Sequence, residues 1–155
     1  MNIEKQLVLG TPVKVGGRVY TLIGIDRYQM MNTLRKPVDW RSFTITREAE
    51  RLSFSIMNEE ICLWRSCEMY PREKTLICEY SGLAFVEFDG NQGPSKPFAS
   101  LSWFEIDDPQ YHYFAVESFT DCDTTMPSRK DVHYFLGRVL PPEELHVLSS
   151  SESTI

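Results

Sequence analysis

Val13-Lys-Val-Gly-Gly-Arg-Val-Tyr-Thr-Leu-Ile-Gly-Ile25 is the stretch of sequence that decides the fold class. Apolar and polar residues alternate on both sides of Gly16-Gly17, and a period of two is typical of a half-buried strand. Consecutive glycines supply the positive φ angles that a tight two-residue hairpin turn requires. We therefore expect the chain to begin as an antiparallel hairpin and not as a cofactor-binding α/β unit.

The same alternation recurs along the rest of the 155-residue chain. It predicts strands over 40–47, 52–57, 61–64, 76–80, 83–88, 99–105 and 111–119, with the apolar run 61–64 buried on both faces. Loops are expected over 29–39 and 89–97, and a helical turn over 141–145. The segment 128–140 fits either a helix that begins near Ser128 or a strand with a bulge at Gly137, and we favour the strand.

About nine short strands separated by turns predict an all-β, mainly antiparallel fold. The expected architecture is a small barrel or two packed sheets, with at most one or two short helical turns. We expect a single domain over 1–148, in which 7–89 and 98–148 form halves, and a frayed polar tail over 149–155.

The composition excludes several classes of partner. A net charge of −6 and a pI near 5.1 oppose binding to nucleic-acid phosphates and to anionic membrane surfaces. No apolar run is long enough for a spanning helix, and the N-terminus lacks the apolar segment of a signal peptide. We therefore expect a cytoplasmic protein without direct membrane insertion. Its cysteines contain no C-x-x-C pair, and we expect free thiols that pack as small apolar groups.

No set of residues has the spacing of a catalytic or metal site. Cys122 lies between two aspartates, which oppose thiolate formation, and the histidines are far apart in the sequence. There is no Gly-rich phosphate loop before a helix. We expect no catalytic residues, no metal and no cofactor.

Aromatic and acidic residues on the predicted strands are the candidate binding groups. Tryptophan and tyrosine bury large areas and act as anchors at interfaces. Glu105 and Glu117 lie on strands expected to pair, so they are candidates for a carboxylate pair that divides acid and base roles in one cleft. The aromatic candidates for a partner or ligand site are Trp40, Trp64, Trp103, Tyr111 and Tyr113.

The order of these features resembles the bacterial family called domain of unknown function 4178. The matching motifs are Leu9-Gly-x-x-Val, Trp40-Arg-Ser-Phe-Thr-Ile, Leu52-Ser-Phe-Ser-Ile, Gly82-x-Ala-x-Val, Trp103-Phe-Glu, Phe114-Ala-Val-Glu and Tyr134-Phe-Leu-Gly-Arg-Val-Leu-Pro-Pro-Glu. They extend over residues 7–148. The chain departs from the family in having Arg41-Ser42 where an acidic residue usually follows the tryptophan.

The resemblance implies a β-rich bacterial cytoplasmic protein without established catalytic residues. It also implies an adaptor role beside membrane-associated systems. Our first hypothesis is accordingly a non-catalytic protein-binding module, with Trp103 or Tyr111 on an exposed apolar patch. The alternative is a small-ligand-binding protein or hydrolase-like enzyme with Glu105 and Glu117 in one cleft. Self-association through an unprotected sheet edge is a third hypothesis.

Overall fold

The computed structural model describes residues 3–31, 37–68, 71, 73–89, 98–120 and 132–148. The strands are β1 (Pro12–Val15), β2 (Arg18–Met31), β3 (Pro37–Arg47), β4 (Glu50–Met57), β5 (Glu60–Cys67), β6 (Leu76–Asp89), β7 (Phe98–Ile106), β8 (Tyr113–Thr120), β9 (Val132–Leu140) and β10 (Leu145–Val147). Two 3-10 turns, η1 (Ile3–Gln6) and η3 (Pro142–Glu144), are the helical elements of the described residues. The all-β prediction is confirmed.

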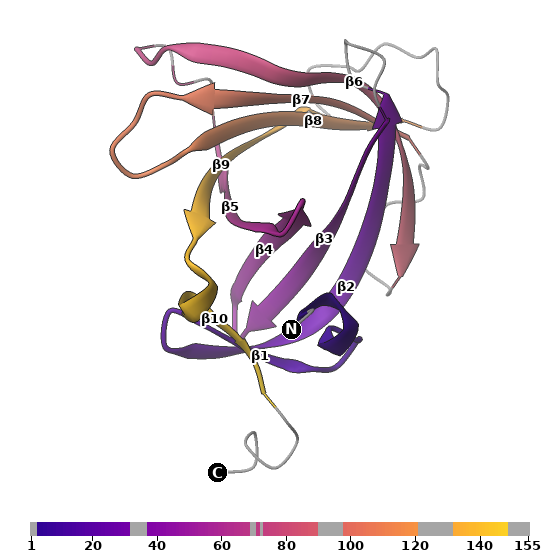
Figure 1. Ribbon diagram of the computed structural model, residues 1–155, viewed down its shortest axis with the longest axis vertical. Helices are drawn as coiled ribbons and strands as arrows, with labels where there is room; N and C mark the ends of the chain where they lie inside the picture. The colour runs from indigo at the N-terminus through magenta and orange to yellow at the C-terminus, as the bar shows by residue number, and fades with distance from the viewer. Residues whose placement is uncertain are drawn as a thin grey trace.

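The strands form one antiparallel sheet that closes on itself (Figure 1). Its order is β10-β1-β2-β3-β4-β5-β9-β8-β7-β6, and β6 pairs with β2 to complete an eight-strand barrel. The long strand β2 makes this closure possible because its first half pairs with β1 and its second half pairs with β6. In the described pairings, the outer edge of β10 and one edge of the first half of β6 have no partner strand.

Alternation along β3–β5 directs side chains into two cores on opposite faces of these strands. The face inside the barrel carries Trp40 and Trp64 toward β7 and β8, in a core rich in aromatic residues. The other face carries Phe43 and Phe54, stacked at 5.0 Å, in a core completed by β1, β10 and η1. Figure 1 shows β6–β8 on one side of β3 and β4, and β1 and β10 on the other. Both faces of the central strands are thus buried.

The turns follow local sequence. Gly16 and Gly17 have φ angles of 57° and 82°, which confirms the predicted hairpin between β1 and β2. The turn between β4 and β5 places Asn58 and Glu59 at φ angles of 51° and 68°. Positive φ at both central residues is the requirement of a type I′ turn, and asparagine tolerates it better than most residues.

Several predicted boundaries are wrong. Residues 29–31 and 37–39 belong to β2 and β3 and not to a loop, because Gln29 pairs with Asp39 beyond the expected strand ends. The pieces 76–80 and 83–88 are one continuous strand, since Ser81 and Gly82 stay in register with β7. The short strand β10 was not predicted; it pairs with β1.

The favoured strand over 128–140 is confirmed for residues 132–140, and the predicted turn over 141–145 contains η3. The predicted bulge at Gly137 is wrong, because Gly137 pairs in continuous register with Trp64 and Tyr113. Packing explains this glycine instead. A Cβ there would lie 2.6 Å from the Cys62 sulfur and 2.7 Å from the Trp64 ring. Residues 90–97, 128–131 and the tail 149–155 lie outside the described part.

Candidate functional site

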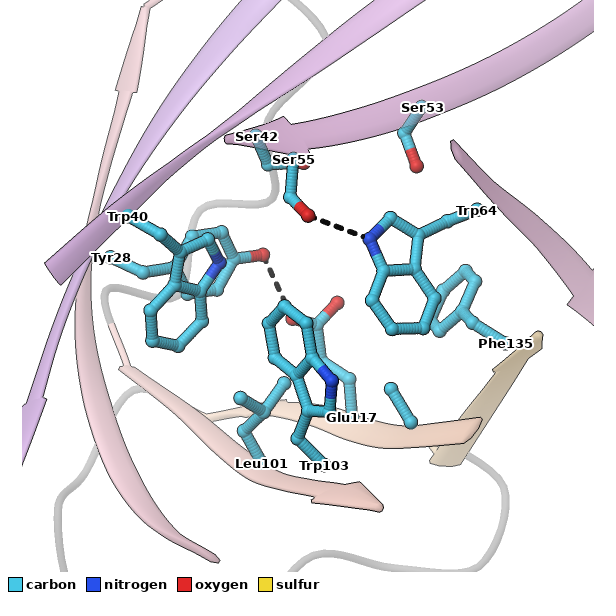
Figure 2. Close-up of a pocket in the computed structure, with 11 residues that line it drawn as sticks. Tyr28, Trp40, Ser42, Ser53, Ser55, Trp64, Leu101, Trp103, Glu117 and Phe135 are labelled. Carbon is cyan, nitrogen blue, oxygen red and sulfur yellow. Dashed lines mark hydrogen bonds between the residues drawn. The ribbon is translucent and has the colours of Figure 1, made fainter. Parts of the chain in front are cut away.

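Four aromatic rings meet inside the barrel and form the walls of a cavity that we call the inner chamber (Figure 2). Tyr28 stacks on Trp40 with ring centroids 4.8 Å apart. The Trp103 ring meets Trp40 edge-on at 5.8 Å and Trp64 edge-on at 4.9 Å. The rings come from β2, β3, β5 and β7, so only barrel closure brings them together.

Glu117 places a carboxyl group among these rings. It is 9% exposed, and the Tyr28 hydroxyl donates a hydrogen bond of 2.8 Å to its Oε2. Burial raises the pKa of Glu117 from 4.5 to about 7; Tyr28 lowers it and the nearby Asp26 raises it. Among the described residues, no lysine, arginine or histidine forms an ion pair with Glu117, although the exposed His133 of β9 is its cross-strand neighbour. The inner chamber therefore holds a carboxyl group that lacks a cationic partner.

Asp26 lies two residues before Tyr28 and therefore on the same face of β2. Burial raises the pKa of Asp26 from 3.8 to about 6, and Arg51 lowers it. Two acidic groups with raised pKa values thus lie at one side of the aromatic core. Raised carboxyl pKa values in a concave site are typical of functional positions.

The inner chamber has a volume of about 70 Å³. Its complete lining is Tyr28, Trp40, Ser42, Ser53, Ser55, Trp64, Leu101, Trp103, Ala115, Glu117 and Phe135. The Trp64 indole N–H donates to the Ser55 hydroxyl at 2.8 Å, whereas the buried Trp103 indole N–H has no hydrogen-bond partner among the residues that the structure describes. Such a buried, unpaired donor is costly, by about 1–3 kcal/mol. Hydrogen bonding thus fixes the Trp64 ring, and packing alone holds the Trp103 ring.

A second cavity of about 280 Å³ adjoins the first, and we call it the outer chamber. It is lined by Ser55, Met57, Asn58, Glu60, Cys62, Glu79, Tyr80, Trp103 and Tyr113. Trp103 and Ser55 line both chambers, so the Trp103 indole forms part of the partition between them.

The titratable groups at the outer chamber are also mainly acidic. The Tyr113 hydroxyl donates a hydrogen bond of 2.8 Å to Glu60. Burial, the contact with Glu105 and the nearby Glu60 together raise the pKa of Glu79 from 4.5 to about 7. Burial and the Glu60 carboxylate raise the pKa of Tyr113 well above its usual value. The outer chamber is therefore aromatic and negatively charged.

The structure brings together some of the residues predicted from sequence and separates others. Trp40, Trp103 and Glu117 line the inner chamber, and Tyr113 lines the outer chamber. Glu105 is exposed and lies beside Glu79. Tyr111 lines a different groove with His112 and Arg138, on the outside of the β5–β9 wall.

Glu105 and Glu117 do not form a pair. In the β7–β8 ladder Leu101 is opposite Glu117, and Tyr113 is opposite Glu105. The two carboxyl groups are therefore four strand positions apart, or about 13 Å along the hairpin. Carboxyl pairs that act on one glycosidic bond are about 5–9.5 Å apart. The spacing does not suit the predicted division of acid and base roles.

Sequence reasoning missed Tyr28, Asp26, Glu60 and Glu79. A signal existed for the first two, because Asp26, Tyr28 and Met30 continue the alternation of β2 beyond the predicted strand end. Glu60 and Glu79 had no such signal. They lie at a turn and at the register shift between Cys78 and Tyr80, and only the barrel brings them to one chamber.

The cysteines of the described part lie in different surroundings. Cys62 is buried, Cys67 is half-buried and Cys78 is exposed. The prediction of packed apolar thiols is thus confirmed for Cys62 and wrong for Cys78; Cys122 lies outside the described residues. Within the described ranges, no group of three or more His, Cys, Asp or Glu is placed to hold a metal ion. Those ranges also contain no helix with the length and apolar character needed to cross a bilayer.

Comparison with protein-family models, curated proteins and solved structures gives no significant match. The resemblance to the domain of unknown function 4178 family accordingly stays a prediction. The site must be interpreted from its own chemistry.

Proposed function

We propose that this protein binds a small molecule inside its barrel. The observation that carries the proposal is Glu117, a buried carboxyl group in a cavity walled by Trp40, Trp64 and Trp103. An apolar residue at this position would avoid the desolvation cost of a carboxyl group. Aromatic walls with a few convergent polar groups are the usual composition of ligand pockets.

The protein-binding hypothesis receives less support. It predicts an exposed aromatic anchor, whereas Trp40, Trp64 and Trp103 are all less than 10% exposed. The large apolar side chains that are exposed in the described part are Val8, Leu9, Val19, Ile77 and Phe85. None of the predicted anchors is among them. An adaptor role in a bacterial cytoplasm, beside a membrane-associated system, therefore stays a prediction that rests on the family resemblance.

Intrinsic fluorescence is a direct test, because all the tryptophans of the chain line the chambers. We would titrate the protein with a library of fragments of about four to ten heavy atoms and record tryptophan emission and thermal unfolding. Compounds that bind in the chambers should change the emission and raise the unfolding temperature, since a ligand that binds only the folded state stabilises it.

A pair of variants on one strand tests where the compounds bind. Ala115→Val adds two carbons to the wall of the inner chamber, and Val116→Thr changes the neighbouring side chain on the opposite face of β8. Binding should weaken in Ala115→Val and persist in Val116→Thr. A library without any binder, or compounds that bind equally to both variants, would refute the proposed function.

A further inference from the structure

We propose, on the basis of the ligand-binding function above, that the ligand is a primary alkylammonium. Its charged nitrogen lies beside Glu117 in the inner chamber, and its alkyl chain extends past Trp103 into the outer chamber. The evidence is the charge of the two chambers, the chemistry of their walls and the way in which the Trp103 ring is held.

The chambers select for positive charge. Glu117 lines the inner chamber, and Glu60 and Glu79 line the outer one. Among the residues that the structure describes, no lysine, arginine or histidine lines either chamber. A cation would supply the counter-charge that Glu117 lacks among the described residues. An anionic ligand would instead meet carboxyl groups at both ends of its path, at a cost that rises as water is excluded.

The aromatic walls fit the same class of ligand. A cation over the face of a tryptophan or tyrosine ring is attracted by the ring quadrupole, and cages of such rings recognise ammonium groups. Tyr28, Trp40 and Trp64 surround the space next to Glu117 (Figure 2). The alkyl chain would lie against Trp103, Tyr113 and Met57, which line the outer chamber.

The volumes of the two chambers limit the size of each end of the ligand. The inner chamber, at about 70 Å³, is less than half of the roughly 150 Å³ cavity that takes up benzene. It therefore suits an ammonium head and excludes an aromatic ring. The outer chamber, at about 280 Å³, has room for a chain of several carbons.

Trp103 separates the two ends of the ligand. Its indole packs edge-on against neighbouring aromatic rings, and a turn of the ring would break no hydrogen bond with the described residues. Within the described ranges the Trp103 N–H has no hydrogen-bond partner, in contrast to the Trp64 N–H, which donates to Ser55. A turn of the Trp103 ring would join the chambers along the wall that they share. The carboxyl groups of Glu60 and Glu79, which line the outer chamber, and of Glu105 beside Glu79 would attract a cation to this entrance.

The test compares matched probes of different charge. Butylamine, 1-butanol and butanoate would be titrated into the protein at pH 8, with tryptophan emission and calorimetry as readouts. Butylamine, which is cationic at this pH, should bind at least about tenfold more tightly than 1-butanol. Butanoate should not bind.

Variants then locate the charged end. Glu117→Gln keeps the size of the side chain and removes its charge, so butylamine affinity should fall by about tenfold or more while 1-butanol affinity is unchanged. Glu87→Gln changes an exposed carboxyl group of β6 that lines neither chamber, and it should bind like the wild type. Near-ultraviolet circular dichroism would show that both variants keep the native fold.

The outcomes separate the two proposals. If 1-butanol and larger neutral fragments bind in the chambers as well as butylamine does, the barrel binds ligands and the alkylammonium inference is wrong. The same holds if Glu117→Gln binds butylamine as tightly as the wild type. If no probe or fragment of any charge binds, the proposed function fails as well.

Discussion

Replacing Glu117 by glutamine should stabilise the protein at alkaline pH. The side chain of Glu117 is buried, and its pKa is raised from 4.5 to about 7 mainly by burial. Between these pH values the folded protein holds a proton that the unfolded chain has released. The free energy of unfolding therefore falls as the pH rises from 4.5 to 7, and the whole loss is present above pH 7.

The rise in pKa sets the size of the effect. At about 1.4 kcal/mol per pH unit, it corresponds to about 3 kcal/mol of lost stability at pH 8. Glutamine has no charge to desolvate, and its amide oxygen can accept the hydrogen bond from Tyr28. For a chain of this length we expect Glu117→Gln to unfold about 6–12 °C higher than the wild type at pH 8.

Urea unfolding at pH 4, 5, 6, 7 and 8 would measure the difference in stability between Glu117→Gln and the wild type. That difference should grow with pH and level off above pH 7. The exposed Glu87→Gln serves as the matched control and should show no such trend. A difference that is constant from pH 4 to 8, whatever its sign, would show that Glu117 is not a buried group with a raised pKa.

Three further predictions follow from contacts inside the barrel. Gly137→Ala should lower the free energy of unfolding, measured with urea, by about 1–3 kcal/mol, because the new Cβ would lie 2.6 Å from the Cys62 sulfur. Gly24→Ala is the control and should lower it much less, because the nearest atom to its Cβ would be 3.6 Å away. Equal losses of stability in the two variants would contradict this packing. Tyr28→Phe should raise the pKa of Glu117, as followed by carbon NMR of the carboxyl group, because the Tyr28 hydroxyl stabilises the carboxylate; a lower pKa in the variant would be inconsistent with that bond. Thiol alkylation, mapped by mass spectrometry, should modify Cys78 fastest and Cys62 slowest of the described cysteines, because burial raises the pKa of Cys62 and shields its sulfur. Similar alkylation rates for these two cysteines would contradict the structure.

Local signals predicted the elements well and their ends less well. The Gly16-Gly17 turn and the strands around Phe43, Phe54 and Leu63 follow from alternation and turn residues, which act over a few neighbours. The loop predicted over 29–39 failed because the β2–β3 pairing extends both strands further. Pairing between strands supplies hydrogen bonds that a local pattern does not contain.

The candidate site was predicted in part. Trp40, Trp64 and Trp103 were identified because large aromatic side chains act as anchors, and Glu117 because a carboxyl group inside an aromatic strand is unusual. The prediction of an exposed patch that includes Trp103 or Tyr111 was wrong for Trp103, which is buried. Alternation shows that neighbouring residues face opposite sides of a strand but not which side is buried.

The sequence by itself determined that this protein is antiparallel and all-β, because the period of two and the glycine turn are properties of adjacent residues. The tertiary structure alone decided that β6 closes on β2, that Glu117 is opposite Leu101 and not Glu105, and that Trp103 lies between two chambers. These features depend on register and closure between strands far apart in the chain. The free energy that stabilises them comes from burying whole faces of strands against one another. No single segment of the sequence specifies which faces meet.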